Sequence, residues 1–278
     1  MSKRVAVVSA LVEGNSLRST CRMTGVAMNT VLKLLAELGA ACADLHDAKV
    51  RDVDAVRVQC DEIWQFIGAK AKNVSDEQKI AGWGDCWTWT AIDADTKLII
   101  SYEIGARNAF NCYEFMKDLA SRLTGRVQLS TDGLRWYHDA VDHAFGIDVD
   151  FATITKVFGK VAADPAASVR YSPAKITGVV KEVIRGNPDN RHISTSYVER
   201  QNLTMRMSMR RFTRLTNGFS KKIENHMAAT ALHFAYYNFC RVHQTLRVTP
   251  AMEARLTDHV WSLEELVALL DRRSAQAA

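Results

Sequence analysis

Three acidic residues lie at positions where a carboxylate needs a cation or another partner to compensate its charge. Asp61 interrupts an otherwise apolar, strand-like stretch, where an unpaired carboxylate would be costly. Asp132 follows Val127–Thr131, which predicts a short buried strand, and precedes a glycine. Glu199 stands at the head of a helix-like run rich in arginine. Carboxylates that converge repel one another unless a divalent cation neutralises them, so these residues predict a metal site.

Each of these residues has a plainer alternative. Asp61 could lie at a strand edge, and Glu62 is the other carboxylate at that place, although strand alternation turns it to the opposite face. Asp132 and the glycine after it could simply form a turn. Glu199 could pair with a neighbouring arginine on a solvated helix.

The run behind Glu199 is basic and, from residue 200 to residue 222, contains no acidic residue. Its cations are Arg200, Arg206, Arg210, Arg211, Arg214, Lys221 and Lys222. Such a block repels itself unless a polyanion lies against it, and nucleic acid is the usual one. An acidic residue at the edge of a phosphate-binding surface would repel the phosphates. It fits best if a divalent cation lies between the carboxylate and the phosphates. The stretch therefore predicts a metal ligand within a surface that handles DNA or RNA.

The elements that would position the first two carboxylates show a strand period. Apolar and polar residues alternate from Val56, and two further strands follow at residues 86–92 and 97–104, joined by short turns. A helix, the short strand Val127–Thr131, a helix over Trp136–Phe145 and a fifth strand at 149–154 complete the pattern. This order is that of an RNase H-like α/β domain, a mixed five-stranded sheet with flanking helices. In that sheet the first and fourth strands are neighbours, which would bring Asp61 and Asp132 together.

Residues 3–44 have apolar positions at helical spacing and predict three short helices. Cys21 is small enough for two helices to approach closely, and Gly25 suits the left-handed turn of a helix-turn-helix. The second helix would present its first turns to a DNA major groove. The residues in question are Met28, Asn29, Thr30 and Lys33. The alternative is a plain helical hairpin that has a glycine in its turn.

The sequence thus predicts a small all-α helix-turn-helix domain (1–45), a charged linker (46–55), the RNase H-like domain (56–255, with an insertion around 158–192) and a C-terminal helix and tail (256–278). The 278 residues carry a net charge of +5, with 47% apolar and 24% charged residues, typical of a folded soluble protein. Six scattered cysteines without a Cys-x-x-Cys pair argue against a zinc ribbon and for a reducing cytoplasm. No apolar stretch approaches about 18 residues, so we expect no membrane contact.

Four motifs together resemble a known family. These are the strand Asp61-Glu62-x-Trp64, the turn Thr131-Asp132-Gly133, the helix Glu199-Arg-x-Asn202 and the downstream run from Tyr237 to Ala251. They are similar to the DDE transposases of bacterial insertion sequences, most of all to the group named after insertion sequence one. The resemblance spans about residues 56–255.

The resemblance implies a function and a set of roles. It implies binding of double-stranded DNA, both element ends and target, by a homodimer or larger assembly in the bacterial cytoplasm at the nucleoid. Asp61, Asp132 and Glu199 would be catalytic and would bind two Mg²⁺ (or Mn²⁺) ions for DNA cleavage and strand transfer. Arg200 and Arg206 would hold phosphates, and Asn202 would orient Glu199 or contact DNA.

The chain also departs from the family pattern. The distance from Asp132 to Glu199 is 67 residues, longer than in compact members, and leaves room for Asp164 or Glu182 as a rival third carboxylate. Asp164 precedes a proline in an apparent turn, and the residues around Glu182 predict an amphipathic helix. Two other functions stay open: a catalytically silent, domesticated DNA-binding protein, and an RNase H-like nuclease.

Overall fold

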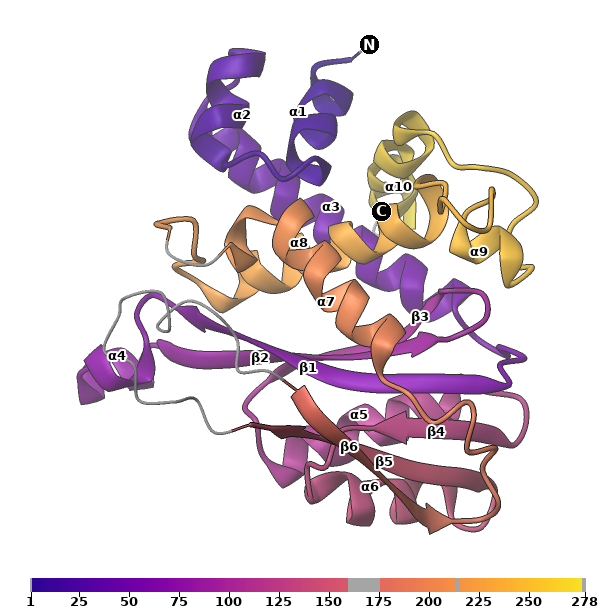
Figure 1. Ribbon diagram of the computed structural model, residues 1–278. Helices are drawn as coiled ribbons and strands as arrows, with labels where there is room; N and C mark the ends of the chain where they lie inside the picture. Colours follow the sequence, from indigo (N-terminus) through magenta and orange to yellow (C-terminus); the bar gives the residue numbers. More distant parts are fainter. Residues whose placement is uncertain (1, 160–175, 214–215, 277–278) are drawn as a thin grey trace.

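A mixed sheet of six strands forms the centre of the molecule. The computed structural model describes residues 2–159, 176–213 and 216–276. Its strand order is β3-β2-β1-β4-β5-β6 (Figure 1). The strands are β1 (Arg57–Ile67), β2 (Gly84–Asp93), β3 (Ile99–Gly105), β4 (Val127–Thr131), β5 (Val149–Phe158) and β6 (Ile176–Arg185). β1 is antiparallel to β2 and parallel to β4, so the predicted neighbourhood of the first and fourth strands is confirmed.

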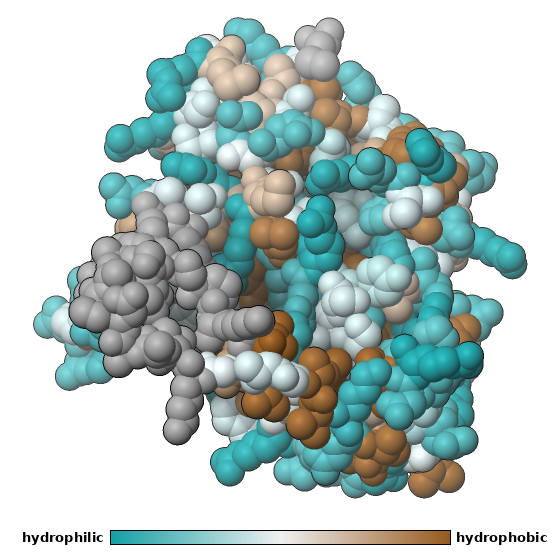
Figure 2. All heavy atoms as spheres, viewed as in Figure 1, coloured by the Kyte–Doolittle hydropathy of each residue, from teal (hydrophilic) through white to brown (hydrophobic). Residues whose placement is uncertain are grey.

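The sixth strand corrects two predictions. The sequence predicts five strands and a helix around Glu182, but Ile176–Arg185 pairs antiparallel with β5 as an edge strand. Its β-branched residues suit a pleated strand better than a helix. Figure 2 shows apolar side chains gathered where β5 ends and β6 begins, and Phe158, Ile176 and Val179 are exposed there.

Helices cover both faces of the sheet. α5 (Ala109–Ser121) and α6 (Trp136–Phe145) pack on one face, whereas α7 (Ser196–Ser208) and α8 (Ile223–Ala235) lie on the other (Figure 1). Asn108 caps α5, because its side chain accepts from the N–H of Asn111. α8 continues into a π-helical turn at Tyr236–Cys240. Short elements complete the fold: α4 (Asp76–Ile80), α9 (Pro250–Glu253), α10 (Leu263–Gln276) and 3₁₀ turns at Ala71–Asn73 and Arg210–Phe212.

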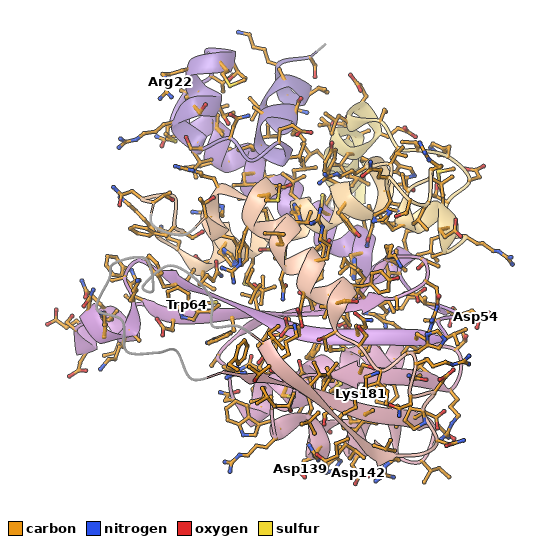
Figure 3. All side chains as sticks on the ribbon, in the orientation of Figure 1. Arg22, Asp54, Trp64, Asp139, Asp142 and Lys181 are labelled. Carbon is orange, nitrogen blue, oxygen red and sulfur yellow. The ribbon has the colours of Figure 1, made fainter. Side chains whose placement is uncertain are left out.

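The front of the chain forms a helical module that projects from the sheet. α1 (Lys3–Val12), α2 (Leu17–Thr24) and α3 (Met28–Lys49) follow one another, and α2 and α3 meet at an angle of 113°. Gly25 has φ +68° at the turn between them, a conformation that glycine adopts without strain. Figure 3 shows Arg22 of α2 far from the β-sheet. The two helices and the glycine turn of the predicted motif are therefore present.

α3 is much longer than predicted. It extends four residues into the predicted linker, packs along α8, and is followed by the buried residues Val50 and Val53. Its apolar side chains belong to the same core as β1, α5 and α6. Within the described residues no single helix is long and apolar enough to cross a membrane; α2 and α3 meet the length and composition only when counted together across their bend.

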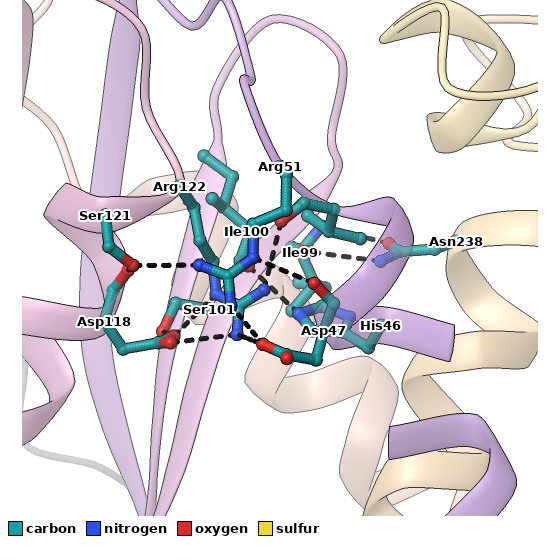
Figure 4. Close-up of polar contacts among 11 residues, drawn as sticks. His46, Asp47, Arg51, Ile99, Ile100, Ser101, Asp118, Ser121, Arg122 and Asn238 are labelled. Carbon is teal, nitrogen blue, oxygen red and sulfur yellow. Dashed lines mark hydrogen bonds and ion pairs between the residues drawn. The ribbon is translucent and has the colours of Figure 1, made fainter. Parts of the chain in front are cut away.

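A buried arginine ties the end of α3 to the sheet domain. Arg122, 6% exposed, donates to both carboxylate oxygens of Asp118 (2.7 and 2.9 Å), to Asp47 (3.0 Å) and to the carbonyl of Val50 (3.0 Å) (Figure 4). Nearby, His46 Nε2 lies 3.0 Å from the carbonyl oxygen of Ile100. These contacts join α3 to α5 and β3.

Replacing Arg122 by Met is expected to destabilise the protein by about 3 kcal/mol, because it leaves the Asp118 carboxylate without its buried cation. Arg51→Met provides the control, since Arg51 belongs to the same cluster and pairs with Asp47 but is partly exposed. We expect less than about 1 kcal/mol from the control. Urea unfolding of both variants measures the difference, and equal midpoints would contradict the assigned role.

Candidate metal centre

The register of the sheet places two of the predicted carboxylates side by side. β1 pairs with β4 over three residues, and Gln59 lies opposite Ser130. Continuing that register by two residues brings Asp61 level with Asp132, just past the end of β4. Because β4 stops at Thr131, the edge of β1 is open beside Asp61. The end of a neighbouring strand therefore creates the space in which the carboxylates meet.

Asp61 is a half-buried carboxylate under electrostatic pressure. Burial, together with the charges of Glu62, Asp132 and Glu199, raises its pKa to about 7. One oxygen accepts a hydrogen bond from Asn202 Nδ2 of α7 at 2.8 Å. Nearby charge of one sign that raises the pKa of a carboxyl group is the condition that a cation would relieve.

Glu62 joins this cluster, contrary to the expectation from strand alternation. Ligand oxygens of Asp61, Glu62 and Asp132 all lie within 4.8 Å of one another. Alternation does hold, because Glu62 accepts from Tyr137 of α6 at 3.2 Å while Asp61 is bound from α7 on the other face. Asp132 lies just past the end of β4, however, and oxygens of both carboxylates approach it there.

Arg107 provides the positive charge on the α6 side of the cluster. Its Nε donates to Glu62 at 2.6 Å, and its Nη2 lies 3.7 Å from Asp132. The guanidinium also stacks on the ring of Trp87, with its carbon 4.9 Å from the ring centroid. The Glu62 side chain, 1% exposed, is therefore already paired with a cation, although burial and the charge of Asp132 raise its pKa.

The Asp132 turn is constrained by what lies behind it. One Asp132 oxygen accepts from the N–H of Leu134 at 2.9 Å. A β-carbon on Gly133 would come within 2.6 Å of Thr155 Oγ1, so a larger residue would force the Thr155 side chain to move. The glycine after Asp132 thus allows close packing against the neighbouring strand.

Glu199 lies beside the cluster but outside the set of three. It is in the first turn of α7, where it accepts from the Thr195 hydroxyl at 2.7 Å and pairs with Lys156 of β5. Its charge contributes to the raised pKa of Asp61, which places it within electrostatic reach. The structure therefore brings Asp61 and Asp132 together. Glu199 lies near them, with its carboxylate paired to Lys156.

The two rival third carboxylates fare differently. Glu182 is exposed on the edge strand β6, opposite Thr153 of β5. Asp164 falls outside the described residues.

The predicted DNA contacts divide by exposure. Asn29, Thr30 and Lys33 are exposed on the first turns of α3, and Met28 is half-buried there. On and after α7, Arg200 and Arg210 are exposed and Arg206 is half-buried. Two residues face inward: Asn202 binds Asp61, and Arg211 donates to Ser220 at 2.7 Å, with burial lowering its pKa to about 10. Arg214 falls outside the described residues.

Sequence reasoning missed several residues of this site. Gln59 is a polar residue between the apolar residues Val58 and Cys60, a signal that could have been used. No comparable signal marks the other three residues, Arg107, Lys156 and Thr195. Each contacts a carboxylate elsewhere in the sequence, at separations of 45, 43 and 4 positions.

The donor set suits a hard divalent cation. Carboxylate oxygens are the ligands that Mg²⁺ and Mn²⁺ prefer, and the three clustered carboxylates supply them. Asn202 Oδ1 is buried next to Asp61 and has no hydrogen-bond partner among the described residues, so a further oxygen is available. These residues therefore fit such an ion.

Comparisons with known proteins do not assign the chain to a family. No protein-family model matches it, and no curated protein matches it. Among solved structures, a cryo-EM structure of a piggyBac transposase synaptic complex with hairpin DNA gives a TM-score of 0.42 at 10% identity, over 98% of this chain and 71% of that chain. A likeness of this size carries no argument about function.

Proposed function

We propose that this protein is a DNA transposase of the DDE kind, related to those of bacterial insertion sequences, acting on DNA at the nucleoid. The observation that carries the proposal is the carboxylate cluster of Asp61, Glu62 and Asp132 where β1 passes the end of β4. The basic helix α7 beside it, with Arg200 exposed, supports a nucleic-acid substrate.

Asp61 and Asp132 would hold divalent cations, and Glu199 would be the third ligand. Glu62 is nearer, but its carboxylate is buried and already bound by Arg107 and Tyr137. Glu199 has a 39% exposed side chain, and a bound cation would replace Lys156 as the partner of its carboxylate. Bound Mg²⁺ or Mn²⁺ would supply positive charge for the attacking and leaving oxygens of a phosphodiester.

The remaining residues of the site would position the DNA and the carboxylate of Asp61. Arg200 and Arg210 would bind phosphates flanking the scissile bond, without reading sequence. Asn202 keeps the carboxylate of Asp61 facing α7. The proposed reaction is hydrolysis at an element end, which frees a 3′-hydroxyl, followed by attack of that hydroxyl on target DNA. Joining two ends in one event would require at least two copies of the chain.

The test uses DNA fragments that carry the sequences flanking the gene, incubated with Mg²⁺ and either the wild type or Asp132→Asn. Cleavage and joined products from the wild type alone would support the proposal. Cleavage without joining would favour the nuclease, and DNA binding without either would favour a silent DNA-binding protein. Equal products from both proteins would overturn the assigned site.

A matched pair of variants decides the third ligand. Glu199→Gln is expected to weaken Mn²⁺ binding at least about tenfold, because a carboxylate ligand is lost. Glu62→Gln removes a carboxylate of the same cluster, and we expect a smaller effect on Mn²⁺ affinity because Arg107 holds it. Isothermal titration with Mn²⁺ measures both. The reverse order would make Glu62 the third ligand.

The front module would bind the element ends through α3. Replacing Asn29 or Lys33 by Ala is expected to lower DNA affinity about tenfold, because both are exposed on its first turns. Lys33→Ala should also reduce the dependence of affinity on salt by about one unit of slope. Lys79→Ala, an exposed lysine of α4, is the control. Fluorescence anisotropy at several salt concentrations measures the change, and an equal loss in the control would argue against α3.

A further inference from the structure

A buried glutamine of β1 binds the first turn of the helix that carries Glu199. Gln59 is 3% exposed, and its Oε1 accepts from the N–H groups of Tyr197 at 2.8 Å and Val198 at 3.3 Å. The first N–H groups of a helix have no partner within the helix and need an outside acceptor. Gln59 therefore caps α7 from the sheet.

The residue that would ordinarily cap this helix is otherwise engaged. Thr195 occupies the N-cap position of α7, yet its side chain makes no capping hydrogen bond. Its hydroxyl instead donates to Glu199 Oε1 at 2.7 Å. The cap from Gln59 thus leaves Thr195 available to hold the carboxylate.

A second contact joins the same strand to the same helix. Asp61, two residues beyond Gln59 on the same face of β1, accepts from Asn202, four residues beyond Val198 on α7. Two residues of a strand advance about 6.6 Å and four residues of a helix about 6 Å, so the two pairs match in spacing. Glu199 lies between the two attachment points. The helix can therefore neither slide along β1 nor lift at its first turn without breaking one of these bonds.

We propose that Gln59 is a positioning residue that fixes Glu199 relative to Asp61. The inference rests on the proposed function in taking Glu199 as a metal ligand. Without the Gln59 acceptor, the exposed N–H groups of Tyr197 and Val198 would draw the Thr195 hydroxyl oxygen towards them. Glu199 would then lose its fixed hydrogen-bond donor and its place beside Asp61.

The test replaces Gln59 by Met, which is similar in size but accepts no comparable hydrogen bond. Gln59→Glu restores the acceptor at the helix N-terminus, where a carboxylate is favourable. Gln65→Met is the matched control: Gln65 is a buried glutamine on the same strand and face, bound to His226 of α8. Gln59→Asn, whose shorter side chain withdraws the acceptor, serves the same comparison if the Met variant does not fold.

Three readouts separate positioning from a general structural effect. In Gln59→Met, hydrogen exchange of the Tyr197 and Val198 amides should accelerate at least about tenfold, because their acceptor is gone. Mn²⁺ affinity should fall about tenfold, a loss within the range for groups that orient a metal ligand. In DNA cleavage kcat should fall while KM for DNA stays unchanged. Gln59→Glu should restore amide protection, and Gln65→Met should leave all three at wild-type values.

Two outcomes would overturn the inference and are distinguishable. If the wild type shows neither Mn²⁺ binding nor metal-dependent cleavage, the proposed function fails and the role of Gln59 fails with it. If the wild type shows both and Gln59→Met behaves like Gln65→Met, the proposed function stands and the positioning role alone is wrong.

Discussion

Replacing Asp61 by Asn is expected to abolish DNA cleavage and at the same time to stabilise the folded protein. Activity should fall at least about a thousandfold, because the loss of a carboxylate ligand removes about 4 kcal/mol of charge stabilisation in the transition state. The stability gain follows from the site itself. Burial and the charges of Glu62, Asp132 and Glu199 all oppose the ionised form of Asp61. The amide of Asn has no charge to oppose, and its oxygen can still accept from Asn202.

The pH dependence gives the sign of the stability effect. The pKa of Asp61 rises from 3.8 to about 7 on folding, so between these values the folded state binds a proton that the unfolded state does not. Stability from this group is therefore complete below pH 4 and is lost as pH rises through 7. Asp61→Asn should recover about 2–4 kcal/mol at pH 8, from a shift of about three units at 1.4 kcal/mol each.

Urea unfolding at pH 5 and pH 8, alongside the cleavage assay, measures both effects. Asp54→Asn is the control, since Asp54 is an exposed aspartate ahead of β1 (Figure 3). We expect it to change neither activity nor stability. Suppose instead that Asp61→Asn is inactive and also less stable than the wild type at pH 8. The ionised carboxylate of Asp61 would then stabilise the fold, which would contradict this prediction.

Local sequence patterns were sufficient where an element depends on its own residues. β4 and α6 have the predicted bounds, Val127–Thr131 and Trp136–Phe145, because a short buried strand and an amphipathic helix each have a clear period. β6 was not predicted, because its charged flanks fit a helix and only pairing with β5 makes it a strand. Tertiary contact decided that segment.

The candidate site shows the same division. The convergence of Asp61 and Asp132 follows from strand order, which the sequence indicates. The inclusion of Glu62 depends on where β4 ends, a feature that strand alternation does not contain. The contacts of Glu199 with Lys156 and of Glu62 with Arg107 join residues 43 and 45 positions apart, so no local pattern could reveal them.

The second large effect concerns acid. Three buried histidines are held neutral in the fold: burial lowers the pKa of His46 to about 4, and those of His226 and His233 to about 3. Nearby arginines contribute to the lowered pKa of each ring. Below pH 6.5 these rings bind protons in the unfolded chain but stay neutral in the folded chain. Stability therefore falls as pH drops from 6.5 towards 3, opposite to the effect of Asp61.

Three imidazoles outweigh one carboxyl group, so we expect acid unfolding between about pH 6 and pH 4. The nominal loss is about 5–10 kcal/mol, comparable with the whole stability of a typical domain. His233→Leu tests it most cleanly, because neither ring nitrogen of His233 has a hydrogen-bond partner among the described residues and the side chain is 3% exposed. It should raise the free energy of unfolding at pH 7 by about 1–2 kcal/mol, the penalty for an unpaired buried polar group.

His233→Leu should also shift the midpoint of acid unfolding to lower pH, because one of the three histidines that take up a proton only on unfolding is gone. His259→Gln is the control: His259 is exposed, and the hydrogen bonds that its ring donates to Asp258 and Glu265 raise its pKa instead of lowering it. Its removal should therefore not protect against acid. Circular dichroism followed from pH 8 to pH 3 measures the midpoints. An acid midpoint of His233→Leu equal to that of the wild type would contradict the assignment of His233 as a ring that the fold holds neutral.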